Sequence, residues 1–229
     1  MPKSLNHSSL HHYILKHLID FGHAPNREKL SAHFGVAKPQ LDEALLALQD
    51  YHGVVLHPHN PEVWVIHPFS TAPTNFLIKS ANGLWWGNCA WCSLGAAALL
   101  QTDLSITTTL AAHDRQVVIS IENGEVVNQG LLVHFPIPMK NAWDNVMYTC
   151  SNMLVFDNEK QIDDWCKRHD MNKGDVQPLE KIWHFAKDWY GNHLDPEWNK
   201  WTVEEAKALF TKHELTHPVW DLGASCERF

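Results

Sequence analysis

Apolar residues in the first third of the chain recur at helical spacing in three successive stretches. A helix is predicted in LHHYILKHLIDFG, where Gly22 marks the end of the pattern. A second helix, REKLSAHFG, is predicted between Asn26, whose side chain suits an N-cap, and Gly35. A third is predicted in KPQLDEALLALQDY, and its leucines are expected to face inward: Leu41, Leu45, Leu46 and Leu48.

Two short β-like runs, VVLHP and EVWVIHP, follow the third helix. Three helices and a β-hairpin in this order are typical of a winged helix-turn-helix, which we predict over residues 1–75. In a DNA-binding protein the third helix would read the duplex. Here it holds one basic and three acidic residues: Lys38, Asp42, Glu43 and Asp50. Because that balance repels phosphates, we expect a packing or dimerisation module that binds no nucleic acid.

Beyond this unit the pattern of the chain changes. Residues 68–80, rich in Pro, Ser and Thr, are expected to form a linker. VVISIENGEVV is typical of a hairpin with a turn at Asn123 and Gly124, and LLVHFPIP of another strand. Helices are predicted in QIDDWCKRH, PLEKIWHFAKDWYGNHL and TVEEAKALFTKH, the last with a capping box of Thr202 and Glu205. We therefore predict an α+β protein whose residues 76–229 form a core of mixed or antiparallel sheet with a C-terminal helical extension.

Composition narrows the class of protein. A hydrophobic fraction of 45% and a charged fraction of 19% indicate a packed globular chain. The formal net charge of −8 argues against a general nucleic-acid binder. No signal peptide is recognisable, and the longest apolar run, CAWCSLGAAALL, is far shorter than the roughly 20 residues of a membrane span. Five cysteines, an odd number, favour free thiols in a reducing compartment, so we expect a cytoplasmic protein, with homodimerisation left open.

Cys89 and Cys92 form a Cys-x-x-Cys pair ahead of an apolar helical stretch. Such a pair binds a soft metal, forms a redox disulfide or is inert and buried. A helix N-terminus there would favour the thiolate. A structural zinc site would need a second such pair, which this sequence does not contain. The antiparallel strand pattern disfavours a thioredoxin-like site. Taken singly, the other cysteines are typical of core residues: Cys150, Cys166 and Cys226.

Three other patterns offer weaker chemistry. His213 to His217 read HELTH, which matches the zinc-binding His-Glu-x-x-His pattern, but Pro218 disfavours helix at its end. Four tryptophans are expected to pack in the core, with an aromatic substrate pocket as the alternative: Trp183, Trp189, Trp198 and Trp201. Three carboxylates are candidate acids that no spacing singles out: Asp144, Asp163 and Asp164.

Taken together, the cysteine segments resemble the organomercurial lyase (alkylmercury lyase) family. Residues 90–94, AWCSL, resemble the family's first catalytic cysteine segment. Residues 144–156, DNVMYTCSNMLVF, resemble the second, and 163–169 resemble the helix that follows it. The family also begins with a winged-helix-like domain. The resemblance spans most of residues 10–195 and does not include HELTH.

The resemblance implies cleavage of the carbon–mercury bond of a small-molecule substrate, with no cofactor required. Two thiolates, Cys92 and Cys150 by position, would capture the mercury, and a carboxylic acid would protonate the carbon. The chain departs from the family twice. The family's acid lies three residues after the first cysteine, where this chain has Gly95, and Cys89 stands where the family often has tyrosine.

These departures leave three interpretations, of which we favour the first. The chain is a lyase in which Cys89 or another acid replaces the missing carboxyl group. Alternatively it binds a soft metal, Hg, Cu or Zn, without turnover, through Cys89, Cys92 and Cys150. In the third interpretation it is a thiol-dependent lyase or hydrolase of a different organic substrate. The first two require the three sulfurs to meet in one pocket.

Overall fold

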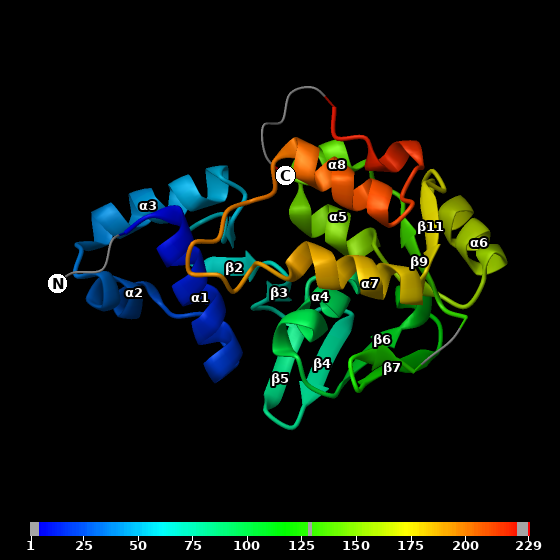
Figure 1. Ribbon diagram of the computed structural model, residues 1–229, viewed down its shortest axis with the longest axis horizontal. Helices are drawn as coiled ribbons and strands as arrows, with labels where there is room; N and C mark the ends of the chain where they lie inside the picture. Colours follow the sequence, from blue (N-terminus) through cyan, green and yellow to red (C-terminus); the bar gives the residue numbers. More distant parts are fainter. Residues whose placement is uncertain (1–4, 128–129, 224–228) are drawn as a thin grey trace.

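The computed structural model describes residues 5–127, 130–223 and 229 (Figure 1). It begins with three helices, α1 (His7–Phe21), α2 (Arg27–Phe34) and α3 (Lys38–Asp50). The Asn26 side chain caps α2 by accepting an N–H, and Gly22 and Gly35 end α1 and α2 in the left-handed conformation. The predicted helices and these end signals are therefore confirmed.

One predicted core position of α3 is wrong. Leu41, Leu45 and Leu48 are fully buried, whereas Leu46 is 50% exposed. Residues three or four apart share a face of a helix, so the first three leucines line up. Leu46 directly follows Leu45 and therefore points toward another side of α3.

An eight-stranded antiparallel sheet is formed by strands between Val55 and Val126, in the order β1-β2-β3-β5-β4-β6-β7-β8. The predicted turn is confirmed, because Asn123 and Gly124 have φ values of 51° and 77° between β7 and β8. The strands of this sheet are β1 (Val55–Leu56), β2 (Val63–Ile66), β3 (Phe69–Ser70), β4 (Phe76–Ser80), β5 (Gly83–Gly87), β6 (Leu104–Thr109), β7 (Gln116–Glu122) and β8 (Glu125–Val126).

The expected linker over residues 68–80 is wrong, because β3 and β4 lie within it. Phe69, Phe76 and Ile78 are buried in the core, and β3 pairs with both β2 and β5. The polar residues that suggested a linker are used in the sheet: the Thr74 hydroxyl donates to the Gly87 carbonyl at 2.6 Å. The sheet is therefore continuous from β2 into the core, and the boundary at residue 75 stays a prediction.

A second antiparallel sheet has β9 at its centre, between β10 and β11. Helix α4 packs along α7, and α7 and α8 lie side by side (Figure 1). The predicted α+β class with antiparallel sheets is confirmed. The remaining elements are α4 (Ala90–Leu100), η1 (Leu110–Ala112), β9 (Leu132–Phe135), η2 (Met139–Asn141), α5 (Val146–Asn152), β10 (Val155–Phe156), α6 (Glu159–His169), β11 (Asp175–Pro178), α7 (Leu179–Tyr190), α8 (Val203–Lys212) and η3 (Pro218–Trp220). Within the described ranges, none of the helices has both the length and the apolar character needed to cross a membrane.

The chain between α7 and α8 runs out to the N-terminal helices and back, as the orange segment of Figure 1 shows. The His12 ring nitrogen Nδ1 lies 3.1 Å from the Leu194 carbonyl oxygen. The rings of His11 and Trp198 stack with centroids 3.7 Å apart. The first helix and the segment after α7 are thus in direct contact.

Candidate active site

The Cys-x-x-Cys pair lies at the start of α4, as predicted. Cys89 is the N-cap, and its Sγ accepts the backbone N–H of Cys92 at 3.3 Å. The passage from β5 into α4 is tight, because a Cβ on Gly87 would lie 2.9 Å from the Cβ of Ser93. The Ser93 hydroxyl donates to the Cys89 carbonyl at 2.7 Å. Both sulfurs are therefore fixed at a helix N-terminus, where negative charge is favoured.

Cys150, on α5, lies beside the Cys-x-x-Cys pair. The first N–H of α4 donates to the carbonyl of Met153 at 3.1 Å, which ties the end of α5 to the start of α4. A nitrogen of His67 and the sulfurs of Cys92 and Cys150 all lie within 4.8 Å of one another. Cys89 is buried with them, and its Sγ donates to Sδ of Met153 at 3.7 Å. The structure thus brings the three predicted cysteines into one buried group; their catalytic roles stay a prediction.

The three thiols differ in acidity. Burial by itself raises the pKa of Cys92, but hydrogen bonds from Cys150 and Cys89 and the neighbouring His67 outweigh it and hold the pKa well below its usual value. Hydrogen bonds to the other two cysteines, with burial, raise the pKa of Cys150. Burial raises the pKa of Cys89. Cys92 is therefore the most acidic thiol of the group.

A cavity of about 70 Å³ opens onto these sulfurs. That volume is several times the roughly 10–15 Å³ that one water molecule needs, so a small ligand fits. No aspartate or glutamate is among its described lining residues. Trp183, Trp189 and Trp198 are buried in the core, as predicted. Three of the four tryptophans considered above also line the cavity, so the pocket has aromatic walls; its five tryptophans are Trp91, Trp143, Trp189, Trp198 and Trp201.

Tyr190 of α7 fills the space beside Gly95. A Cβ on Gly95 would lie 2.8 Å from Cγ of the Tyr190 ring and closer still to two other ring atoms. Helices α4 and α7 therefore fit together only because residue 95 has no side chain. The Tyr190 hydroxyl oxygen lies 3.4 Å from Sγ of Cys92. Burial and the charge of Cys92 raise the pKa of this phenol well above its usual value.

Three residues of the site were missed by the sequence analysis: His67, Tyr190 and His193. His67 follows β2, and the chain offers 17 histidines without a signal that distinguishes this one. Burial lowers the pKa of His193 to about 3, so its imidazole is neutral where it lines the cavity. Tyr190 had only one signal in the sequence, the glycine at position 95 that accommodates its ring.

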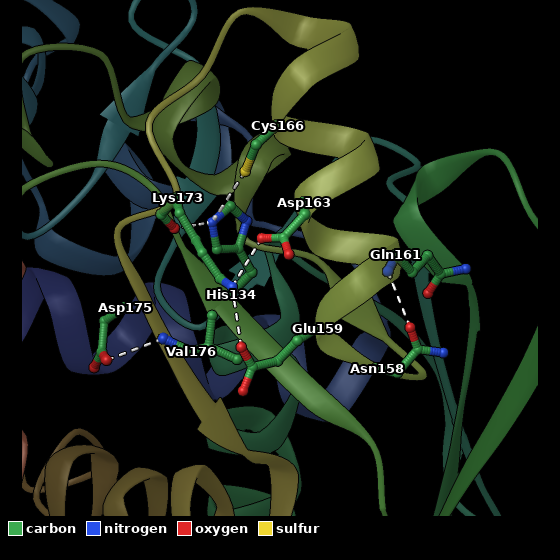
Figure 2. Close-up of polar contacts among 9 residues, drawn as sticks. All are labelled: His134, Asn158, Glu159, Gln161, Asp163, Cys166, Lys173, Asp175 and Val176. Atoms are coloured by element: carbon green, nitrogen blue, oxygen red, sulfur yellow. Dashed lines mark hydrogen bonds and ion pairs between the residues drawn. The ribbon is translucent and has the colours of Figure 1, made fainter.

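The candidate acids of the sequence analysis do not line this cavity. Asp163 forms an ion pair with Lys173 at 2.8 Å on the outer face of α6 (Figure 2). Asp164 pairs with the lysine one turn earlier in the same helix at 2.6 Å. Asp144 accepts a hydrogen bond from an asparagine side chain at 2.8 Å. These three carboxylates serve local surface contacts.

Cys166 lies apart from the other thiols, on α6. Figure 2 shows its sulfur beside His134, with Sγ 3.8 Å from Nε2 of that ring. The same imidazole also hydrogen-bonds the Lys173 carbonyl. Burial raises the pKa of Cys166, as expected of a core thiol. Cys226 lies outside the described residues.

The HELTH sequence does not form the helical turn that a zinc-binding His-Glu-x-x-His site requires. His213 ends α8, Glu214 has a φ of 52°, and His217 caps the separate η3 helix. Nε2 of His213 lies 2.5 Å from a carboxylate oxygen of Asp188. The two imidazoles therefore do not share a helical face, and the zinc-site interpretation is wrong in its geometry.

Comparisons with known proteins identify a family and a solved structure to which this chain is similar. The family model for alkylmercury lyase matches residues 69–191, more than half of the chain. The crystal structure of the mercury-bound form of MerB2 has a similar fold, with a TM-score of 0.66 and 16% identity over 81% of this chain and 91% of that one. No curated protein matches the chain. The matched residues include Cys89, Cys92 and Cys150, but not the N-terminal helices or the segment after α7.

Proposed function

Because this chain belongs to the alkylmercury lyase family, we propose that it cleaves the carbon–mercury bond of a small organomercurial compound by protonolysis. The observation that carries the proposal is the approach of the Cys92 and Cys150 sulfurs to within 4.8 Å of each other and of a His67 nitrogen. Thiolate sulfur is the kind of ligand that a soft metal ion prefers. The tryptophan-rich walls suit an apolar organic group on the mercury.

The acidity of the three thiols supports an order of events. Cys92, the most acidic of the three, attacks the mercury of the substrate first as a thiolate and displaces the anionic ligand that accompanies the organomercury cation. Cys150, a thiol in the free protein, becomes the second ligand and loses its proton as its sulfur binds. Donation from two sulfurs makes the mercury-bound carbon more basic and easier to protonate. Cys89 is an auxiliary ligand, mercury is the substrate, and no resident cofactor is required.

The test of this proposal is release of the hydrocarbon. Purified protein is incubated with methylmercury and excess small-molecule thiol, and methane in the headspace is measured by gas chromatography. The intact protein should release methane, and Cys150→Ala should not. The matched control is Cys166→Ala, which removes a buried thiol on α6 and should leave the rate unchanged. If the intact protein gives no more methane than Cys150→Ala, the lyase proposal is rejected.

A second candidate function is sequestration of mercury without turnover. The observation that favours it is the lack of a carboxyl group among the described residues lining the cavity, since the reaction needs an acid. It predicts one tightly bound mercury per chain, abolished by Cys92→Ala, and no methane. Weak mercury binding together with no methane would instead indicate thiol chemistry on a different organic substrate.

We also propose that residues 1–75 form a winged helix-turn-helix unit that serves packing or homodimerisation. Its support is the order of α1, α2, α3 and the antiparallel β1–β2 pair. The cytoplasm is the proposed compartment, because it keeps thiols reduced. Light scattering on the full chain tests the dimer: a mass of one chain, 26.2 kDa, would count against it.

A further inference from the structure

We propose that the Tyr190 hydroxyl is the proton donor to the organic leaving group, in place of an acid at position 95. This inference rests on the proposed lyase function and names the group which that reaction still lacks. Its starting point is the packing of α4 against α7. A Cβ on Gly95 would overlap the Tyr190 ring, so the room an acid would need at position 95 is filled by tyrosine.

The position of the hydroxyl group supports the same assignment. The Tyr190 oxygen lies 3.4 Å from Sγ of Cys92, the sulfur proposed to hold the mercury. The side chain is 3% exposed and lines the cavity. A carbon bound to mercury on Cys92 would therefore lie in the same buried space as this O–H group. Among the described lining residues, no carboxyl group competes for the role.

His67 is the strongest competitor, because its nitrogen lies within 4.8 Å of both catalytic sulfurs. Its position relative to Cys92 and Cys150 is that of a third ligand, since the three donor atoms are close enough to one another to hold one metal ion. A nitrogen that binds the metal has its lone pair occupied there and carries no proton at that atom. The geometry therefore assigns binding to His67 and proton donation to Tyr190.

The step balances without an oxidant or reductant. Cys92 holds the substrate as S–Hg–R, and the Tyr190 O–H gives its proton to the carbon. The carbon–mercury bond breaks, and its electron pair forms the new C–H bond of the hydrocarbon. Cys150 forms the second S–Hg bond in the same step, so that both sulfurs donate to the mercury while the carbon is protonated, and the proton that Cys150 releases restores the Tyr190 hydroxyl. The proton lost by Cys150 is thus the proton gained by the product.

Tyr190→Phe tests the assignment, because it keeps the ring that fills the space at Gly95 and removes only the O–H group. The variant is loaded with one equivalent of methylmercury, and two quantities are measured: mercury retained after gel filtration, and the single-turnover rate of methane release. We expect unchanged retention and a release rate at least about 100-fold lower, the lower end of what general acids contribute. The control Tyr148→Phe, at a tyrosine that is 52% exposed, should match the intact protein.

A rescue experiment separates proton donation from packing. Tyr190→Ala should be slow, and Tyr190→Ala combined with Gly95→Asp should be at least about tenfold faster, since the carboxyl group then has the room left by the ring. Release at the normal rate by Tyr190→Phe would overturn this inference alone. If His67→Gln then retained mercury but released no methane, the proton donor would be His67 and not Tyr190. An intact protein that retains mercury and never releases methane would overturn the lyase function, and this inference with it.

Discussion

Cys89 caps the helix that carries Cys92: its sulfur accepts the Cys92 backbone N–H at 3.3 Å. One side chain therefore holds the first turn of α4 and also stands beside the proposed reactive sulfur. A hydroxyl group makes the same type of cap but is a poor ligand for a soft metal. Substitution at this one position can consequently separate structural support from metal binding.

We predict that Cys89→Ala lowers the free energy of unfolding by about 0.5–2 kcal/mol, the usual cost of losing an N-cap. Cys89→Ser should recover most of that loss, because serine caps well. Both variants should bind mercury less tightly than the intact protein, since each lacks the third thiol. Urea denaturation and competition titration with a small dithiol measure the two effects. Equal stability of the Ala and Ser variants would contradict a capping role.

Gly95→Ala should destabilise the protein even though alanine favours helix by about 1 kcal/mol over glycine. The added methyl group overlaps the Tyr190 ring, and overpacking of a core costs about 1–3 kcal/mol. We therefore expect an unfolding free energy that is lower by up to about 2 kcal/mol in urea denaturation.

The control for this prediction is the same substitution in a Tyr190→Ala background. With the ring removed, the methyl group has room and the helix propensity of alanine alone should act. Gly95→Ala should then stabilise the protein relative to Tyr190→Ala. A destabilisation of equal size in both backgrounds would show that the ring is not what requires glycine.

Stability should fall as the pH drops below neutral. Burial lowers the pKa of His134 to about 4 and that of His193 to about 3, whereas an unfolded histidine titrates near 6.5. Between about pH 6.5 and 4 the unfolded chain binds protons that the folded chain does not, so acid favours unfolding. Each histidine contributes a slope of up to about 1.4 kcal/mol per pH unit.

Urea midpoints at pH 7, 6 and 5 measure this slope. His134→Gln removes one of these titrating groups and keeps an N–H donor for the Lys173 carbonyl, which the imidazole now contacts. The variant should have a shallower dependence on pH than the intact protein. Identical midpoints at pH 7 and pH 5 would be incompatible with two neutral, buried histidines.

The surface carboxylates should be dispensable for the reaction. Asp163 pairs with Lys173, and Asp144 with an asparagine, and neither lines the cavity. Asp163→Asn and Asp144→Asn should therefore release methane at the rate of the intact protein. A tenfold loss with either substitution would mean that the proton reaches the carbon by a route outside the cavity.

Local signals explain which parts of the fold could be predicted. The ends of the N-terminal helices are determined by residues within one turn of them, such as Asn26 and Gly35 at the two ends of α2. The segment 68–80 was predicted wrongly because the pairing of β3 with β5 depends on residues distant in the sequence. Proline and serine content describes the segment itself and carries no information about the strand that it joins.

The residues of the candidate site fall into the same two groups, those with a local sequence signal and those without one. Cys89, Cys92 and Cys150 could be identified because each lies in a segment with its own recognisable sequence. Tyr190 could not, because its contact with Cys92 exists only once α7 packs on α4. Position 95 could be recognised as lacking an acid, but the aromatic ring that occupies the space comes from a different helix.

The stacking of His11 on Trp198 has a consequence for the newborn protein. The segment that contains Trp198 leaves the ribosome after all three clustered cysteines have emerged. Until that segment packs on α1, the cavity beside the thiols is incomplete, and the thiols are accessible to soft metal ions and oxidants. These cysteines are therefore buried only late in synthesis, when the segment that contains Trp198 packs on α1.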